Sequence, residues 1–419
     1  MNLSAHILKI AKAARKASYT FALVSSKEKN AALKAMAAAL VKNQAYLIKE
    51  NAKDLKAASG EGYSKALVDR LTLNPKNIKA MADSLVETSK LKDPVGELLE
   101  TIKRPNGLLI KKVRVPLGVV GIIYESRPNV TSDCAGLCLK SGNAAILKGG
   151  KEAIHSNKAI FKILKSVLAK TKIPLDALQL IESTDRQAVH ELLKLDQLVD
   201  VIVPRGGEEL IRFVAANTKI PVVKHFQGIC HVYVSKNADL EMASDIVINA
   251  KTQKPGVCNA METLLVDRKV ARDFLPSMIV DLQARGCEIR GDEATRALVK
   301  GGVNKATEQD WRTEYLDLIL SVKVVDGLTE AIEHINTYGS HHSDAIITKN
   351  KKEAQAFLDS VDSACVYVNA STRFTDGFEF GFGSEVGIST DKLHVRGPMA
   401  LEGLTSYKYE VYGSGQIRG

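Results

Sequence analysis

A cysteine beside a tight turn is the residue of this sequence best suited to covalent chemistry. Lys254-Pro255-Gly256 predicts a turn, Cys258 comes two residues later, and an apolar strand is predicted at 262–266. A thiol displayed on such a turn is accessible, and neighbouring backbone N–H groups can stabilise its thiolate. The alternative is a buried cysteine that acts as a small hydrophobic residue. Four other cysteines lie in helical or strand patterns and are predicted to be structural: Cys134, Cys138, Cys287 and Cys365.

Two predicted strand ends carry a basic residue followed by two glycines. Lys148-Gly149-Gly150 ends the strand at 144–148, where an open α/β sheet binds ligands. A lysine there suits a ribose hydroxyl or a phosphate, whereas the alternative is a solvated side chain. Arg205-Gly206-Gly207 follows the strand at 199–203 and opens a helix. Its glycines allow backbone N–H groups to approach a phosphate or to pack against a nicotinamide.

Several common motifs are absent from the sequence. The glycine-rich segments lack GxGxxG spacing, and no GxxxxGK[ST] occurs, which disfavours a P-loop nucleotidase. His341 and His342 are adjacent, so their side chains diverge along the chain, and no CxxC or HExxH supports them as metal ligands. We therefore predict no metal.

The elements that must position these residues alternate between strand and helix, which is typical of parallel, doubly wound sheets. Residues 1–100 are rich in helix, with Leu33, Met36, Ala37, Leu40 and Val41 at helical spacing and a helix boundary at Asn74-Pro75. The predicted strands are 119–124, 144–148, 179–182, 199–203, 222–224, 262–266, 287–290, 318–324, 343–348 and 364–368. The predicted helices are 131–140, 151–170, 185–194, 207–217, 239–251, 268–284, 328–337 and 350–360.

Three further segments break this alternation. Thr101–Val115 predicts a hairpin around Pro105-Asn106-Gly107. Residues 371–403 are glycine-rich and predict a long functional loop. Leu404–Ile417 resembles a strand that needs a partner, either the hairpin or another subunit.

Length and composition favour a soluble globular protein of two domains. The chain has 419 residues, 45% hydrophobic and 25% charged, which is ordinary for a globular protein. The net charge of +10 fits an anionic substrate, a membrane surface or nucleic acid, but only 5% of residues are aromatic, which disfavours binding to bases. The six cysteines form no disulfide framework, and neither a signal peptide nor a membrane span is apparent. We expect a cytoplasmic protein with reduced thiols.

Taken together, these motifs resemble the aldehyde dehydrogenase superfamily over almost the whole chain. The segments that carry the resemblance are 115–153, 199–211, 224–234, 251–266, 338–348, 366–390 and 396–415. The similarity is closest to the branch that reduces an acyl phosphate in proline biosynthesis. It implies an α/β fold of two doubly wound domains with a small β oligomerisation extension. The implied parts are an NADPH-binding domain at 1–101 and 117–232, a catalytic domain at 233–382, a crossover at 383–403, and the extension at 102–116 and 404–419.

The resemblance also implies roles for individual residues. Cys258 matches the catalytic thiol, and Asn129 is the candidate for the asparagine that stabilises the oxyanion. Lys148 matches the lysine on the adenosine ribose, and Arg205-Gly206-Gly207 replaces the usual glycine-rich turn near the nicotinamide. Glu314 is similar to the glutamate that holds the nicotinamide ribose.

One departure from the superfamily is informative. Where members that form acids carry a glutamate before a pair of glycines, this chain has His225-Phe226-Gln227-Gly228. An enzyme that hydrolyses its thioester needs a base to activate water, whereas a reductase of acyl phosphates must keep water out. The resemblance therefore implies NADPH-dependent reduction of L-glutamate 5-phosphate to L-glutamate 5-semialdehyde and phosphate through a Cys258 thioester. His225 is a candidate proton shuttle.

The resemblance leaves the substrate residues, the partners and three other functions open. Arg127, Arg373 and Arg396 are unranked candidates for binding the substrate. We expect a homo-oligomer, based on a dimer, and a transient association with glutamate 5-kinase. The alternative functions are a coenzyme-A-acylating or phosphorylating aldehyde dehydrogenase on another acyl donor, a nucleic-acid-binding protein, and an inactive structural homologue.

Overall fold

The computed structural model describes residues 2–299 and 301–418, which divide into two compact units. Unit 1 comprises the chain up to Lys224 together with Gly381–Gly387 and the residues from Pro398 onward. Unit 2 comprises His225–Phe380 and Ile388–Gly397. The sequence prediction placed the corresponding boundary after residue 232.

Unit 1 begins with five helices: α1 (Leu3–Phe21), α2 (Ser26–Lys42), α3 (Gln44–Gly60), α4 (Lys65–Leu71) and α5 (Pro75–Lys90). The predicted boundary at Asn74-Pro75 is confirmed, because Asn74 caps α5 and Pro75 is its first residue. In α2, Leu33, Met36, Ala37 and Leu40 are buried as their spacing predicts. Val41 was grouped with them but is exposed, because it lies beyond the edge of that apolar face.

The sheet of unit 1 has four parallel strands in the order β5-β4-β3-β6. Its elements are β3 (Val119–Tyr124), α6 (Asn129–Lys140), β4 (Ala144–Gly149), η1 (Lys151–Ala153), α7 (Ile154–Leu168), η2 (Leu175–Ala177), β5 (Leu178–Leu180), α8 (Gln187–Leu193), β6 (Val201–Arg205) and α9 (Glu208–Ala216). The predicted strand at 222–224 is wrong, since only Val222 forms a bridge, to Ile202, before the chain leaves for unit 2.

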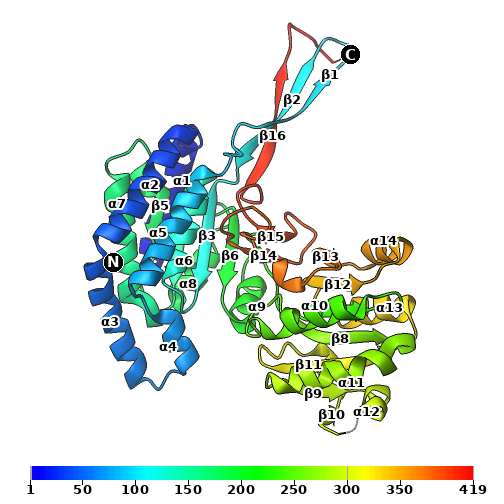
Figure 1. Cartoon of the computed structure of the whole chain (residues 1–419). Coiled ribbons are helices and arrows are strands. Elements are labelled where there is room, and N and C mark those ends of the chain that lie inside the picture. The colour runs from blue at the N-terminus through cyan, green and yellow to red at the C-terminus, as the bar shows by residue number, and fades with distance from the viewer. Residues whose placement is uncertain (1, 300, 419) are drawn as a thin grey trace. The chain divides into compact units, whose positions relative to one another are not determined.

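The sheet of unit 2 has seven parallel strands in the order β10-β9-β11-β8-β7-β12-β13. Its elements are β7 (Cys230–Val234), α10 (Leu240–Thr252), β8 (Met261–Asp267), α11 (Arg268–Ala284), β9 (Glu288–Gly291), α12 (Glu293–Leu298), β10 (Val303–Lys305), η3 (Asp310–Arg312), β11 (Ile319–Val325), α13 (Leu328–Tyr338), β12 (Ser343–Ile347), α14 (Lys351–Ser360) and β13 (Cys365–Val368). Helices α10 and α11 pack on one face of this sheet, and α13 and α14 on the other (Figure 1). The predicted doubly wound α/β architecture is confirmed.

The remaining strands belong to small sheets. Strands β1 (Leu98–Lys103), β2 (Leu109–Pro116) and β16 (Thr405–Tyr412) form an antiparallel sheet (Figure 1). The partner that the C-terminal strand needs is therefore the hairpin of its own chain. The glycine-rich segment holds η4 (Thr372–Phe374) and the paired strands β14 (Gly387–Ser389) and β15 (Gly397–Met399).

Candidate active site

Three side chains with reactive atoms meet at the amino edge of the unit 2 sheet. Strands β8, β7 and β12 are neighbours and parallel, so the residues that precede them gather at one edge. Cys258 precedes β8, His225 precedes β7, and His342 directly precedes β12. One ligand atom from each of these residues lies within 4.8 Å of the others. The thiol singled out in the sequence is thus joined by two imidazoles.

The loop that carries Cys258 is held by its neighbours on two sides. A Cβ on Gly228 would stand 2.0 Å from the Cys258 carbonyl oxygen, so only glycine allows this approach of the two backbones. The Cys230 thiol donates to the same carbonyl at 3.2 Å. The next residue, Asn259, is buried, and its Nδ2 donates to the Thr375 carbonyl at 2.8 Å. These contacts fix the backbone and leave the Cys258 side chain half-buried rather than fully enclosed.

A cationic side chain lies close enough to Cys258 to interact with it electrostatically. This side chain belongs to Arg373 on η4. The pKa of the Arg373 guanidinium is lowered, mainly because the side chain is partly buried. A fixed positive charge stabilises a neighbouring thiolate. His342 is buried, and burial lowers the pKa of its imidazole to about 3. His342 is therefore neutral and does not compete with Arg373 as a cation at physiological pH.

A buried ion pair supports the loop that carries Glu314. Lys251 Nζ lies 2.6 Å from Glu262 Oε2, and both side chains are fully buried. The other Glu262 oxygen accepts the Leu316 backbone N–H at 3.2 Å. Burial raises the pKa of Glu262 to about 7, against the opposing effect of Lys251. Glu314 lies close enough to raise the pKa of Glu262 further. Glu314, the residue predicted to bind the nicotinamide ribose, belongs to unit 2, as Cys258 does.

In unit 1, Lys148 lies at the carboxyl edge of the sheet, near the end of β4. The side chain is buried, and burial lowers the pKa of its ammonium. Its Nζ donates to the Gly149 carbonyl at 2.7 Å, which leaves further donor capacity for a hydroxyl or a phosphate. A Cβ on Gly149 would stand 2.2 Å from the Asn157 amide, so this glycine is required for close packing after the strand.

The turn Arg205-Gly206-Gly207 is bound by a carboxylate of its own unit. The Gly207 N–H donates to Glu125 Oε2 at 3.0 Å, and a Cβ on Gly206 would collide with the same carboxylate. Glu208 and Glu209 occupy the first turn of α9 and add negative charge. The helix N-terminus alone would attract a phosphate, but these carboxylates act against one. Of the two ligands considered from the sequence, the geometry favours a nicotinamide.

Comparison with known proteins decides the family. The sequence model described as "Aldehyde dehydrogenase family" matches residues 3–318, which is most of the chain. The chain belongs to the aldehyde dehydrogenase family. Members of this family are oxidoreductases that use nicotinamide cofactors, so the resemblance based on the sequence motifs is confirmed.

The relatives within the aldehyde dehydrogenase family match over the full length. The chain is 56% identical over 402 residues to the gamma-glutamyl phosphate reductase of Nautilia profundicola, covering 96% of this chain and 97% of the relative. It is 55% identical over 418 residues to the enzyme of that name from Moorella thermoacetica, covering all of both chains. The crystal structure of gamma-glutamyl phosphate reductase from Thermotoga maritima superposes with a TM-score of 0.96 at 46% identity, covering 99% of this chain and 100% of that one.

The structure separates the predicted site residues into two groups. Cys258 and Glu314 lie in unit 2, whereas Asn129, Lys148 and the Arg205 turn lie in unit 1. Asn129 is exposed at the start of α6, and its Nδ2 donates to Asp133 Oδ2 at 2.8 Å. Burial raises the pKa of Asp133 to about 6. This bond uses one of the two amide hydrogens of Asn129.

The three candidate arginines differ in their surroundings. Arg396 Nη1 lies 2.8 Å from Asp362 Oδ1, so its charge is compensated within unit 2. Arg127 is exposed in unit 1. Arg373 interacts electrostatically with Cys258 and belongs to the same unit.

Two residues of the site were missed from the sequence. His342 was set aside because it adjoins His341, and Gly228 was noted only as part of a substituted motif. Gly228 lies before β7, which pairs with β8, and His342 lies before β12, which pairs with β7. Each of these residues precedes an apolar run in the sequence. That position indicates a site residue only when the order of the strands in the sheet is known.

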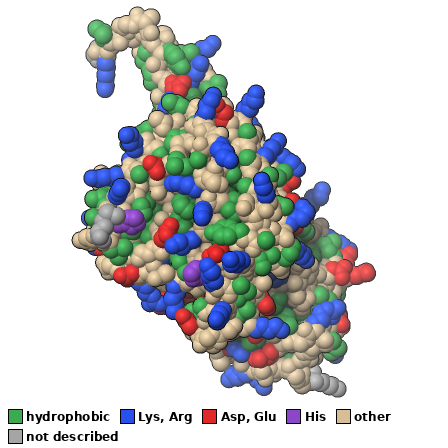
Figure 2. Space-filling view, turned by 90° about the vertical axis from the view of Figure 1, so that its left-hand side faces the viewer, with side chains coloured by type: hydrophobic (Ala, Val, Ile, Leu, Met, Phe, Trp, Pro, Cys, Tyr) green, Lys and Arg blue, Asp and Glu red, His purple; other side chains and the backbone are tan. Residues whose placement is uncertain are grey.

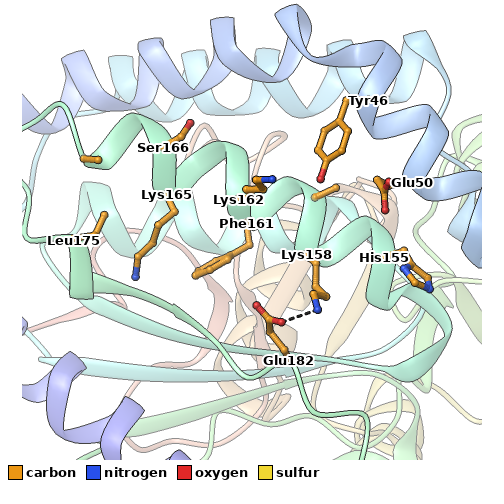
Figure 3. Close-up of a pocket in the computed structure, with 12 residues that line it drawn as sticks. Tyr46, Glu50, His155, Lys158, Phe161, Lys162, Lys165, Ser166, Leu175 and Glu182 are labelled. Atoms are coloured by element: carbon orange, nitrogen blue, oxygen red, sulfur yellow. Dashed lines mark ion pairs between the residues drawn. The ribbon is translucent and has the colours of Figure 1, made fainter.

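A separate cavity of about 570 Å³ lies in unit 1, between α3 and α7 (Figure 3). Tyr46 and Glu50 line it from α3, and Lys158 and Lys165 line it from α7. Lys158 is paired with Glu182 at 2.6 Å, and Lys165 donates to a backbone carbonyl. None of the predicted site residues lines this cavity, and its cations already have partners, so we assign it no part in the reaction.

Proposed function

We propose that the protein reduces L-glutamate 5-phosphate to L-glutamate 5-semialdehyde and phosphate, with NADPH as the reductant, in proline biosynthesis. The observation that carries this proposal is the full-length similarity, above 50% identity, to enzymes named gamma-glutamyl phosphate reductase. The chemistry of the Cys258 site supports it, because a thiol lies there beside a fixed positive charge.

The first half of the reaction falls to unit 2. The Cys258 thiolate attacks the acyl carbon, the bond to the phosphate oxygen breaks, and phosphate leaves. Arg373 binds the anionic substrate and compensates the charge of the leaving group. Asn129 is proposed to donate its remaining amide hydrogen to the tetrahedral oxyanion. The product of this half-reaction is a thioester on Cys258.

The second half returns the thiol to its starting state. When bound, NADPH would supply the hydride that reduces the thioester carbon. The oxyanion that results collapses to the aldehyde and expels the Cys258 thiolate, which the charge of Arg373 stabilises. The position of the usual general base is taken by the His225–Gly228 segment, so no glutamate activates water there, and the thioester persists until it is reduced. His225 is the candidate to move a proton at this stage.

Binding of the cofactor is assigned to Lys148, the Arg205-Gly206-Gly207 turn and Glu314. A buried ammonium at the carboxyl edge of a parallel sheet fits the adenosine ribose or its 2′-phosphate. The acidic surroundings of the turn fit a nicotinamide ring better than a phosphate. Glu314 would accept hydrogen bonds from the nicotinamide ribose.

A coenzyme-A-acylating or phosphorylating enzyme with another acyl donor is the second candidate. An acetylating aldehyde dehydrogenase from Geobacillus thermoglucosidasius shares the fold, with a TM-score of 0.69 at 17% identity. Purified protein should therefore be given L-glutamate 5-phosphate or acyl-coenzyme A while NADPH oxidation is followed. The proposal predicts turnover with the acyl phosphate and none with the thioester. The opposite preference would establish the second candidate.

The role of Cys258 as the nucleophile is tested by replacing this thiol and, as a control, a second thiol of the same unit. Cys258→Ser should reduce kcat by about 10³-fold or more, because a serine hydroxyl stays protonated at neutral pH. Cys287→Ser is the control, since Cys287 is a buried thiol of the same unit outside the proposed site. It should retain activity. Equal losses in both variants would show that the effect is structural.

The expected assembly also belongs to the proposal. In the three-stranded sheet, β1 and β16 are edge strands, and Leu98, Tyr409 and Val411 are exposed on them. Open apolar edges favour pairing in a two-fold dimer, which light scattering at micromolar concentration should detect. Transient association with glutamate 5-kinase and a cytoplasmic location remain predictions. No helix in the described part of the chain is long and apolar enough to cross a membrane.

The positive net charge supports nucleic-acid binding less well than it supports binding of an anionic substrate. On the face shown in Figure 2, Lys and Arg side chains are interspersed with acidic and apolar ones. A nucleic-acid site would gather them into one patch or stripe. A salt-dependent shift of RNA without NADPH turnover would support that alternative.

A further inference from the structure

The cluster of His225, Cys258 and His342 contains the donor set of a zinc site. We propose that these three side chains bind Zn²⁺ reversibly and that the bound ion inactivates the thiol. The binding itself depends only on the geometry of unit 2, whereas the inhibition rests on the proposed function of Cys258. The ion would be an inhibitor and not a cofactor of the reaction.

The spacing of the three ligand atoms is close to what tetrahedral zinc requires. With Zn–N bonds of about 2.0–2.1 Å and a Zn–S bond of about 2.3 Å, two ligand atoms on one ion lie roughly 3.5 Å apart. The three atoms already lie within 4.8 Å of one another. Cys258 and His225 are only partly buried and can rotate by the ångström that remains. His342 is buried and fixed at the start of β12.

Each of the two imidazoles has a partner on its Nδ1 atom. His225 Nδ1 lies 2.9 Å from the Ile388 carbonyl, which can only accept, so Nδ1 carries the proton and Nε2 carries the lone pair. His342 Nδ1 lies 2.8 Å from Ser343 Oγ. His342 Nε2 is buried and has no hydrogen-bond partner among the described residues. Ligating histidines in metalloproteins are oriented in this way, by a partner on the other ring nitrogen.

A Zn²⁺ ion bound to these three side chains would block the reaction at its first step. Zn²⁺ exchanges three of its bound waters for Cys258 Sγ and the two imidazole nitrogens, and a protonated thiol releases its proton to solvent on binding. The Zn–S bond then holds the sulfur lone pair that otherwise attacks the acyl carbon. Three protein ligands leave the fourth position to water. The charge of Arg373 near Cys258 acts against a second cation. We therefore expect affinity weaker than that of a structural zinc site, and release of the ion by chelators.

Co²⁺ is the direct probe, because its bond to a thiolate gives an absorption band that Zn²⁺ lacks. Metal-free full-length protein should be titrated with Co²⁺ and then, by equilibrium dialysis, with Zn²⁺. We expect one ion per chain, a thiolate-to-cobalt band, and protection of Cys258 from alkylation. Zn²⁺ should inhibit NADPH turnover, and a chelator should restore it.

Adjacent histidines provide the matched variants. His342→Ala should weaken Zn²⁺ binding at least roughly tenfold. His341→Ala should leave binding unchanged, because His341 Nδ1 lies against the Asp362 carbonyl, away from the cluster. If His342→Ala fails to fold, Cys258→Ser replaces it, and the thiolate-to-cobalt band should vanish in that variant.

Two results would overturn the zinc site. One is the absence of stoichiometric binding or of the thiolate band in the native protein. The other is equal affinity in the native protein and His342→Ala. Binding is measured without substrate, and catalysis is measured without added metal. Failure of the zinc site is therefore distinguishable from failure of the proposed function.

Discussion

Gly228 controls the position of the nucleophile, and Gly228→Ala tests this directly. The added Cβ would stand 2.0 Å from the Cys258 carbonyl oxygen and 2.5 Å from the Cys258 Cα, whereas ordinary contacts begin at 3.4 Å. Both obstacles are backbone atoms, so one chain segment must shift by more than an ångström. A misplacement of about 1 Å costs roughly 10²-fold in rate when the reacting groups must be aligned. We expect kcat to fall by about that factor.

The assay must separate misplacement of Cys258 from unfolding. NADPH affinity, measured by fluorescence, should be nearly unchanged, because the residues assigned to the adenosine half of the cofactor lie in unit 1. The rate at which iodoacetamide alkylates Cys258 should change together with kcat. Gly60→Ala is the control, since a Cβ there would meet nothing within 4 Å. Activity of Gly228→Ala within twofold of the native value would refute the reasoning.

Three further predictions concern the cofactor, a buried ion pair and pH. Lys148→Ala should raise KM for NADPH several-fold while kcat moves less, with Lys158→Ala as a control, and steady-state kinetics with an unchanged KM would remove Lys148 from the site. Lys251→Met should lower the free energy of unfolding by about 3–5 kcal/mol, because it leaves Glu262 buried without its partner. The double change with Glu262→Leu should recover most of that loss in denaturant titrations, and no recovery would show that packing, not charge, is responsible. Burial lowers the pKa of His334 from 6.5 to about 2, so its contribution to stability is complete above pH 6.5 and is lost as the pH falls, by up to about 1.4 kcal/mol per pH unit. His334→Phe should flatten this acid-side slope in the free energy of unfolding, and an unchanged slope would contradict the assignment.

The regular elements could be predicted because their sequence patterns are strong. The helix predicted at 268–284 is α11, and its apolar residues recur at helical spacing on the buried face. The strand predicted at 262–266 lies within β8, which is buried throughout. Local periodicity is sufficient where one element packs against one core.

Strand β7 was missed for a physical reason. Its five residues include His231, whose polar ring interrupts the apolar run that marks the other strands. In the fold, His231 Nδ1 lies 2.9 Å from Asp344 on β12, so the polar residue is satisfied by a strand that is distant in sequence. A partner of this kind cannot be identified from local pattern.

The nucleophile of the site could be predicted from the sequence, but the side chains that surround it could not. Cys258 was identified from a turn, which is a local feature. His342 lies 84 positions later in the chain and joins Cys258 only because β12, β7 and β8 are adjacent. In the same way, Glu125 occupies the N–H of Gly207 through a tertiary contact. Strand order, which periodicity does not encode, determines these juxtapositions.

The reverse reaction without phosphate tests the covalent role of Cys258 most directly. Native protein should be mixed with L-glutamate 5-semialdehyde and NADP⁺, and both NADPH absorbance and the intact mass of the protein should be recorded. The account predicts a single burst of one NADPH per Cys258, a mass increase that corresponds to a glutamyl thioester, and turnover only when phosphate is added. Cys258→Ser should give neither burst nor adduct. Steady NADPH formation without phosphate, or a burst in the serine variant, would contradict the account.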